Sequence, residues 1–127
     1  MRAVVTRVSR AGVAVGGEEV SRIGRGLLVL LAAETGDGKK DIDYIVDKVL
    51  HLRIFGDQGK MNRSVLDAGG ELLLVSQFTL MGDARKGRRP SYIRAGAPQT
   101  ARELYDAAVA AFLETGIPCK TGVFQAD

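Results

Sequence analysis

Residues 71–80 of the chain read ELLLVSQFTL, an unbroken apolar run that gives way to polar side chains. A short apolar run that follows a pair of glycines is typical of a strand buried on both faces of a sheet, and it is too short to span a membrane. Ser76, Gln77 and Thr79 supply two hydroxyls and an amide where this strand is predicted to end. We therefore expect a site at the end of a rigid, buried strand.

A basic loop follows the strand directly. Residues 81–90 read MGDARKGRRP, although the net charge of the whole chain is only +3. The cations of this loop are Arg85, Lys86, Arg88 and Arg89. Polar groups presented by a strand beside a basic loop commonly bind an anionic substrate, and clustered cations attract polyphosphate or nucleic acid. Taken without its neighbours, the loop would be interpreted as a solvated surface loop.

The composition is typical of one globular domain. With 127 residues, 46% of them hydrophobic and 26% charged, the chain is expected to form a single domain over residues 1–127. No apolar run approaches the length of a membrane-spanning helix, and the N-terminus lacks the apolar core of a signal peptide. The lone Cys119 cannot form an internal disulfide, which fits a reducing compartment, so we expect a cytoplasmic protein.

The sequence predicts no metal site and no cofactor. His51 is the only histidine, and Cys119 with scattered carboxylates gives no recognisable ligand spacing. His51 is expected at the end of a helix, where a histidine commonly interacts with terminal carbonyl groups. A Ser-His-Asp triad would require His51, and no neighbouring residue supports one.

Alternation and turn glycines predict the strands. Strands are expected at residues 2–8, 26–33 and 119–124, and a hairpin at residues 13–23 turns at two adjacent glycines. A final strand that ends without a pairing partner would leave an exposed sheet edge. This edge indicates a dimer, or further residues beyond Asp127.

Two amphipathic helices complete the prediction. The apolar spacing of residues 41–52 predicts the first, followed by a short strand at residues 53–55 and a turn at residues 56–60. A capping-box spacing that begins at Thr100 predicts the start of the second helix, and Gly116 predicts its end. Because strands and helices do not alternate regularly, the expected class is α+β, with mixed, mostly antiparallel β-sheets.

Several pieces in order resemble a known family. The pieces are RAVVTRV at residues 2–8, GKMN at 59–62, SQFTL at 76–80, RPSY at 89–92 and TGVF at 121–124. Together they resemble the D-aminoacyl-tRNA deacylases, homodimeric cytosolic enzymes also called D-tyrosyl-tRNA deacylases. The resemblance covers nearly the whole chain, and the ordered set is far more specific than any one piece.

The resemblance implies hydrolysis of the ester that joins a D-amino acid, or mischarged glycine, to the terminal ribose of tRNA. It implies tRNA and a second copy of the chain as partners, and a deacylase-like fold. The family motif that lines the aminoacyl-adenosine pocket carries over to Ser76, Gln77, Phe78, Thr79 and Leu80. In this setting the cations of the basic loop, and Lys60 as a further candidate, would contact phosphates and position the tRNA.

The chemistry of ester hydrolysis limits the role of Thr79. Hydrolysis of an ester requires an activated nucleophile and hydrogen-bond donors for the developing oxyanion. The sequence shows no obvious base that could activate the Thr79 hydroxyl. We therefore favour a threonine that only hydrogen-bonds substrate or backbone. The resemblance offers a substitute, in which the 2′-hydroxyl of the terminal adenosine takes part while backbone N–H groups of Phe78 and Thr79 polarise the carbonyl. Gln77 and Ser76 would orient the adenosine or hold the loop, and Phe78 could instead be an ordinary core residue.

One family motif is missing. Family members carry a C-terminal segment with a cis Gly-Pro unit, which enters the partner's pocket and excludes L-amino acids, and no Gly-Pro occurs in these 127 residues. Two explanations remain: a C-terminally incomplete chain, which we favour, or a naturally short variant with impaired selectivity. Two other functions also remain as alternatives, namely a tRNA- or nucleic-acid-binding module without catalysis and a small-ester hydrolase with Thr79 or Ser76 as nucleophile.

Overall fold

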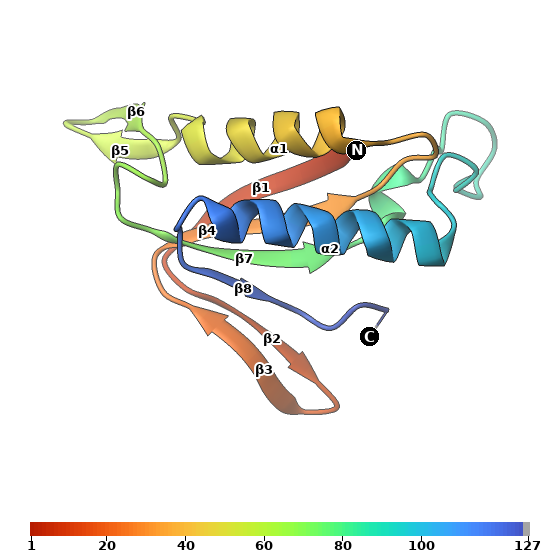
Figure 1. Ribbon diagram of the computed structural model, residues 1–127, viewed down its shortest axis with the longest axis horizontal. Helices are drawn as coiled ribbons and strands as arrows, with labels where there is room; N and C mark the ends of the chain where they lie inside the picture. Colours follow the sequence, from red (N-terminus) through yellow and green to blue (C-terminus); the bar gives the residue numbers. More distant parts are fainter. Residues whose placement is uncertain (126–127) are drawn as a thin grey trace.

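A four-stranded sheet carries two helices on one face (Figure 1) in the computed structural model, which describes residues 1–125. The strand order is β1-β4-β7-β8, with β1 antiparallel to β4 and the other two pairs parallel. These strands are β1 (Arg2–Val8), β4 (Gly26–Ala32), β7 (Glu71–Ser76) and β8 (Cys119–Thr121). Two antiparallel hairpins complete the strands, so the α+β class with mixed, mostly antiparallel sheets is confirmed.

The central strands β4 and β7 are buried on both faces, as their apolar runs predict. Leu72 and Leu74 of β7 pack into the main core beneath the helices. Leu73, which lies between them and points to the opposite face, is also fully buried. The strand that leads to the expected site is therefore held from both sides.

The first helix, α1 (Lys39–His51), buries the predicted apolar stripe that includes Ile42, Val46 and Val49. It begins two residues before the predicted start, because the Asp41 carboxylate accepts a hydrogen bond of 2.9 Å from the backbone N–H of Gly38. His51 is its last residue, with Nδ1 at 2.8 Å from the carbonyl oxygen of Asp47, as expected for a histidine at a helix end.

The second helix, α2 (Pro98–Glu114), does not begin where the sequence predicts. The predicted start at Thr100 is wrong, because the helix starts at Pro98 with Ala97 as its N-cap. Proline suits the first helical position, since its fixed φ is already helical and its missing N–H would have no partner there. The predicted stop is confirmed, because Gly116 follows the helix with a φ of +84°.

The hairpin of β2 (Ala11–Val15) and β3 (Glu18–Ile23) turns at the two adjacent glycines, as predicted. The hairpin of β5 (Phe55–Asp57) and β6 (Lys60–Arg63) differs from the prediction. The predicted strand at residues 53–55 is shifted toward the C-terminus, because the tight turn needs positive φ and finds it at Gln58 (+50°) and Gly59 (+81°).

The last strand has a partner, so the expectation of an unpaired strand is wrong. Strand β8 is shorter than predicted and pairs with β7, with Cys119 opposite Leu72 and Thr121 opposite Leu74. On its other side, the Ser21 hydroxyl of β3 donates to the carbonyl oxygen of Thr121. Neither helix of residues 1–125 combines the length and the apolar character that a membrane crossing requires.

Candidate active site at the end of strand β7

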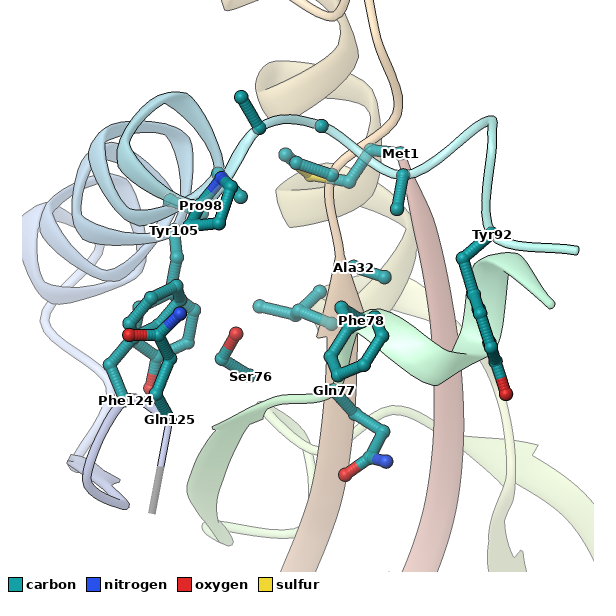
Figure 2. A pocket seen from close by; sticks show the side chains of 17 residues that line it. Met1, Ala32, Ser76, Gln77, Phe78, Tyr92, Pro98, Tyr105, Phe124 and Gln125 are labelled. Atoms are coloured by element: carbon teal, nitrogen blue, oxygen red, sulfur yellow. The ribbon is translucent and has the colours of Figure 1, made fainter.

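A cavity of about 1040 Å³ opens where β7 ends (Figure 2). Its floor comes from the ends of β4 and β7, and its walls come from the start of α2, the segment at residues 92–97, Met1 and Phe124. In Figure 2, Tyr105 and Phe124 lie on one side, Phe78 and Tyr92 on the other, with Ser76 between them. The predicted site at the end of a buried strand thus coincides with a cavity.

The chain leaves β7 through one turn of 3-10 helix, η1 (Phe78–Met81), rather than continuing as a strand. The backbone N–H of Gln77 donates a hydrogen bond of 2.7 Å to the carbonyl oxygen of Leu31, which ties the start of η1 to β4. At the start of a helix the first N–H groups lack intrahelical acceptors. Within residues 1–125, the backbone N–H groups of Phe78 and Thr79 have no acceptor.

Phe78 is not a core residue, so that alternative is wrong. Its side chain is 58% exposed and forms an edge-on pair with Tyr92, with ring centroids 5.4 Å apart. Both rings line the cavity. An aromatic edge therefore stands at the rim of the cavity, next to the polar groups at the end of β7.

The predicted site residues do not all face the cavity. Ser76, Gln77 and Phe78 line it, whereas Thr79 does not and is exposed. The side-chain amide of Gln77 donates a hydrogen bond to the Thr79 hydroxyl. An amide N–H cannot accept a proton, so this contact holds the hydroxyl without activating it as a nucleophile.

Tyr105 forms the inner wall of the cavity and was not predicted as a site residue. Its hydroxyl donates a hydrogen bond of 2.9 Å to the carbonyl oxygen of Leu74. Burial raises the pKa of Tyr105 to about 12, so the phenol stays neutral near pH 7 and cannot serve as a base. The Phe124 ring lies 6.1 Å from that of Tyr105, and the Arg102 guanidinium lies 5.2 Å from the Phe124 ring centre.

The outer wall is fastened to the loop that follows β4. Arg94 forms an ion pair with Glu34 at 2.6 Å, and the Arg94 carbonyl oxygen accepts a hydrogen bond of 3.0 Å from the N–H of Thr35. In the same loop, the carboxylate of Asp37 pairs with the terminal ammonium of Met1 at 2.6 Å. The Arg94 contacts hold the wall at residues 92–97 against this loop, and the Asp37 pair holds Met1, another lining residue, against it.

The basic loop is closed at its base and its cations are not equivalent. Asp83 and Ser91 exchange two backbone hydrogen bonds of 2.8 Å. The Arg85 guanidinium folds back onto Asp83, with its closest contact at 2.6 Å, and these hydrogen bonds lower the pKa of the carboxyl to about 2. Within the described residues, the remaining cations of the loop are exposed and make no ion pair. These cations are Lys86, Arg88 and Arg89.

Lys60 is not brought together with the basic loop. It lies at the start of β6, and Figure 1 shows the β5–β6 hairpin at one end of the molecule and the basic loop at the other. In residues 1–125, no group of three or more His, Cys, Asp or Glu side chains could hold a metal ion. Burial raises the pKa of the Cys119 thiol to about 11, so it is not a thiolate near neutral pH.

Comparison with known proteins places this arrangement in a family. The sequence profile described as D-Tyr-tRNA(Tyr) deacylase matches residues 4–127. A D-aminoacyl-tRNA deacylase of Desulfitobacterium hafniense is 56% identical over 128 residues, which cover 100% of this chain and 86% of that protein. The D-aminoacyl-tRNA deacylase of Heliobacterium modesticaldum is 57% identical over 127 residues, 99% of this chain and 85% of that protein.

A solved structure has the same fold. The structure titled c-Myc DNA Unwinding Element Binding Protein is 41% identical and superposes with a TM-score of 0.94, covering 100% of this chain and 87% of that one. Sequence and fold agree over the length of this chain. The chain therefore belongs to the D-Tyr-tRNA(Tyr) deacylase family.

Proposed function

We propose that this chain hydrolyses the ester bond of D-aminoacyl-tRNA, and of glycine mischarged on tRNA, to give free amino acid and tRNA. Its family makes it a hydrolase of the tRNA-editing, D-aminoacyl-tRNA deacylase class, with aminoacylated tRNA as the substrate. The observation that carries the finer proposal is the cavity at the end of β7, which adjoins the exposed cations of the basic loop.

The cavity suits the aminoacylated end of a nucleic acid. Ligand pockets for small molecules typically measure about 300 to 1,000 Å³, so a volume of about 1040 Å³ leaves room for a nucleoside and its amino acid. Unpaired bases stack on aromatic side chains, and the cavity offers such surfaces at Tyr92, Tyr105 and Phe124. Ser76 supplies a hydroxyl between these walls, where it can orient the ribose.

The chemical step needs no side-chain nucleophile in this proposal. Water adds to the carbonyl carbon, the bond from that carbon to the ribose oxygen breaks, and the ribose oxygen leaves as a hydroxyl with a proton from the water. The adjacent 2′-hydroxyl assists this proton transfer. The backbone N–H groups of Phe78 and Thr79 lack acceptors among residues 1–125, and that of Phe78, which lines the cavity, is the better placed donor to the oxyanion. Fixed donors of this kind lower a barrier substantially.

The basic loop positions the tRNA. Lys86, Arg88 and Arg89 are exposed and make no ion pair among the described residues, so they are free to contact phosphates. Arg85 is expected to contribute less, because its charge is already compensated by Asp83. Phosphate contacts of this kind bind any tRNA with similar affinity. Discrimination between D- and L-amino acids would therefore take place in the cavity.

We further propose that the protein is a cytoplasmic homodimer. The sheet face opposite the helices retains exposed apolar side chains, and Val4 on β1 is 44% exposed beside the half-buried Leu30 of β4. Apolar sheet faces of this kind are commonly covered in an oligomer. Light scattering of the purified chain should give twice the monomer mass, and a monomeric mass at working concentration would overturn the dimer.

The test of the function is side-by-side deacylation of D-tyrosyl-tRNA and L-tyrosyl-tRNA. Release of tyrosine from the D-form alone supports the proposal and shows that these residues suffice for chiral selection. Release from both supports the esterase activity but places selection outside residues 1–127. No release while tRNA still binds would favour the alternative, a nucleic-acid-binding module without catalysis.

A further inference from the structure

A second group of cations gathers at the end of the sheet opposite the cavity. Arg25, Arg53 and Arg63 all adjoin β5. The Arg25 guanidinium lies 5.3 Å from the centre of the Phe55 ring, and Arg63 is the ladder partner of Phe55. Arg53 lies two residues before β5, and Lys60 is the ladder partner of Asp57, the last residue of β5. We call this group, together with Arg7, the distal basic cluster.

Three arginines of the distal basic cluster, Arg7, Arg53 and Arg63, donate hydrogen bonds to backbone carbonyl groups rather than to carboxylates. Arg7 donates a hydrogen bond of 2.7 Å to the carbonyl oxygen of Ile54, and Arg53 donates one of 3.0 Å to the carbonyl oxygen of Asn62. No cation of the cluster forms an ion pair among the residues that the structure describes. The cluster therefore presents oriented guanidinium groups without a close ion pair among the described residues, and such groups suit the bidentate binding of phosphate.

Two carboxylates near the cluster accept backbone hydrogen bonds and make no close ion pair with its cations. Asp67 accepts a hydrogen bond of 3.0 Å from the N–H of Ser64, and Glu71 accepts one of 2.8 Å from the N–H of Gly24. Hydrogen bonds from Ser64, more than the nearby arginines, lower the pKa of Asp67. Asp57, the ladder partner of Lys60, is a third carboxylate beside the cluster, so the five cations of the cluster outnumber three nearby carboxylates.

The cluster and the cavity are separated by the length of the sheet. Arg25 directly precedes β4, whereas Leu31 near the other end of β4 lines the cavity. About six residues of strand, at about 3.3 Å each, separate them by about 20 Å. One strand of a nucleic-acid duplex carries a phosphate roughly every 3.4 Å, so this distance corresponds to roughly six phosphates.

The two ends of the molecule offer different chemistry to a nucleic acid. The cavity end exposes aromatic rings, Phe78 at 58% and Tyr92 at 40%, on which unpaired bases can stack. At the cluster, the aromatic ring of Phe55 is fully buried beneath Arg25, and no exposed ring is available in β5 or β6. Such a surface fits the backbone of a duplex better than a single strand, because duplex RNA is bound mainly through phosphates and sugars.

We propose that the distal basic cluster binds the phosphate backbone of the base-paired stem of the same tRNA whose acceptor end occupies the cavity. This inference rests on the proposed function for the identity of the RNA. The cavity end binds the unpaired terminus and the cluster binds the duplex. The cluster thereby adds affinity and orientation without contributing to the chemical step.

The test is a double variant, Arg25→Gln with Lys60→Gln, measured for binding of uncharged tRNA over a range of salt concentrations. Loss of phosphate contacts should weaken binding and reduce the slope of log affinity against log salt by about one per contact. The matched control is Arg22→Gln, an exposed arginine of β3 that pairs with Glu19. It should leave the salt slope unchanged.

Two further measurements separate the cluster from the cavity. With D-tyrosyl-tRNA the double variant should raise KM several-fold at unchanged kcat, whereas hydrolysis of D-tyrosyl-adenosine, which has no stem, should match the unaltered chain. The double variant should bind a stem-loop RNA without an unpaired end more weakly than the unaltered chain does. Its affinity for a single-stranded oligonucleotide should be unchanged. An unchanged salt slope for a folded double variant would overturn the proposal. Failure of the unaltered chain to hydrolyse either substrate would overturn the proposed function while the binding test of the cluster still stands.

Discussion

The side-chain amide of Gln77 donates a hydrogen bond to the hydroxyl oxygen of Thr79, two residues further along the turn that follows β7. The contact occupies the hydroxyl with a donor, and Thr79 does not line the cavity. His51, the only histidine, lies at the end of α1. Ester hydrolysis at this site is therefore expected to proceed without a covalent threonine.

Replacing Thr79 with alanine tests this mechanism. Thr79→Ala removes the hydroxyl but keeps the backbone N–H, so kcat for D-tyrosyl-tRNA should fall by less than about tenfold. Loss of a true nucleophile typically costs roughly 10⁴-fold or more. A loss of that size would support a covalent threonine or the small-ester hydrolase alternative. Retained stability of the variant, followed by urea unfolding, separates lost chemistry from lost folding.

Charge reversal in the basic loop should weaken tRNA binding when it affects cations that make no ion pair. The double variant Arg88→Glu with Arg89→Glu should bind every tRNA more weakly and reduce the salt slope by about one per lost contact. Arg85→Gln is the matched control, because Arg85 is already paired with Asp83. Equal effects of the two changes would contradict the distinction between paired and free cations.

The parallel pairing of β4 and β7 depends on a glycine. A Cβ at Gly26 would lie 1.9 Å from the carbonyl oxygen of Glu71, so Gly26→Ala must push the strands apart. Overpacking of this kind typically costs about 1–3 kcal/mol, and the free energy of unfolding in urea should fall by at least that amount. Gly56→Ala, where a Cβ would meet no atom within 4 Å, is the control and should change stability far less. Similar losses in the two variants would show that the close approach is unimportant.

The sequence predicted the central strands and the place of the site because these depend on local pattern. The apolar run of residues 72–75 can only be buried, and the polar residues that follow it must then lie at a sheet end. The helix at residues 41–52 followed equally from its apolar spacing. In both cases, burial of one face determines the structure, and burial is visible in the sequence.

The walls of the cavity could not be predicted because they depend on tertiary contacts. Tyr105 lies within α2 and Phe124 follows β8, and no local pattern links them before the sheet has formed. The pairing of Arg85 with Asp83 is also not evident from the sequence, because the four cations of the loop look equivalent until the loop has folded. The strand shift at residues 53–55 arose from a turn that needed positive φ at Gln58, a residue with no turn signature of its own.

The buried phenol of Tyr105 gives a prediction that pH can test. Because burial raises its pKa from 10.0 to about 12, its contribution to stability is fully present below pH 10 and is lost as pH rises toward 12. An absorbance titration should show a late ionisation step near pH 12 from the Tyr105 phenol. Tyr105→Phe should remove this late step and cost about 0.5–1.5 kcal/mol. The cost should be near the lower end, because the carbonyl oxygen of Leu74 keeps its hydrogen bond of 3.1 Å from the N–H of Gly122. Absence of a phenol step near pH 12 would show that the inner wall of the cavity is open to water.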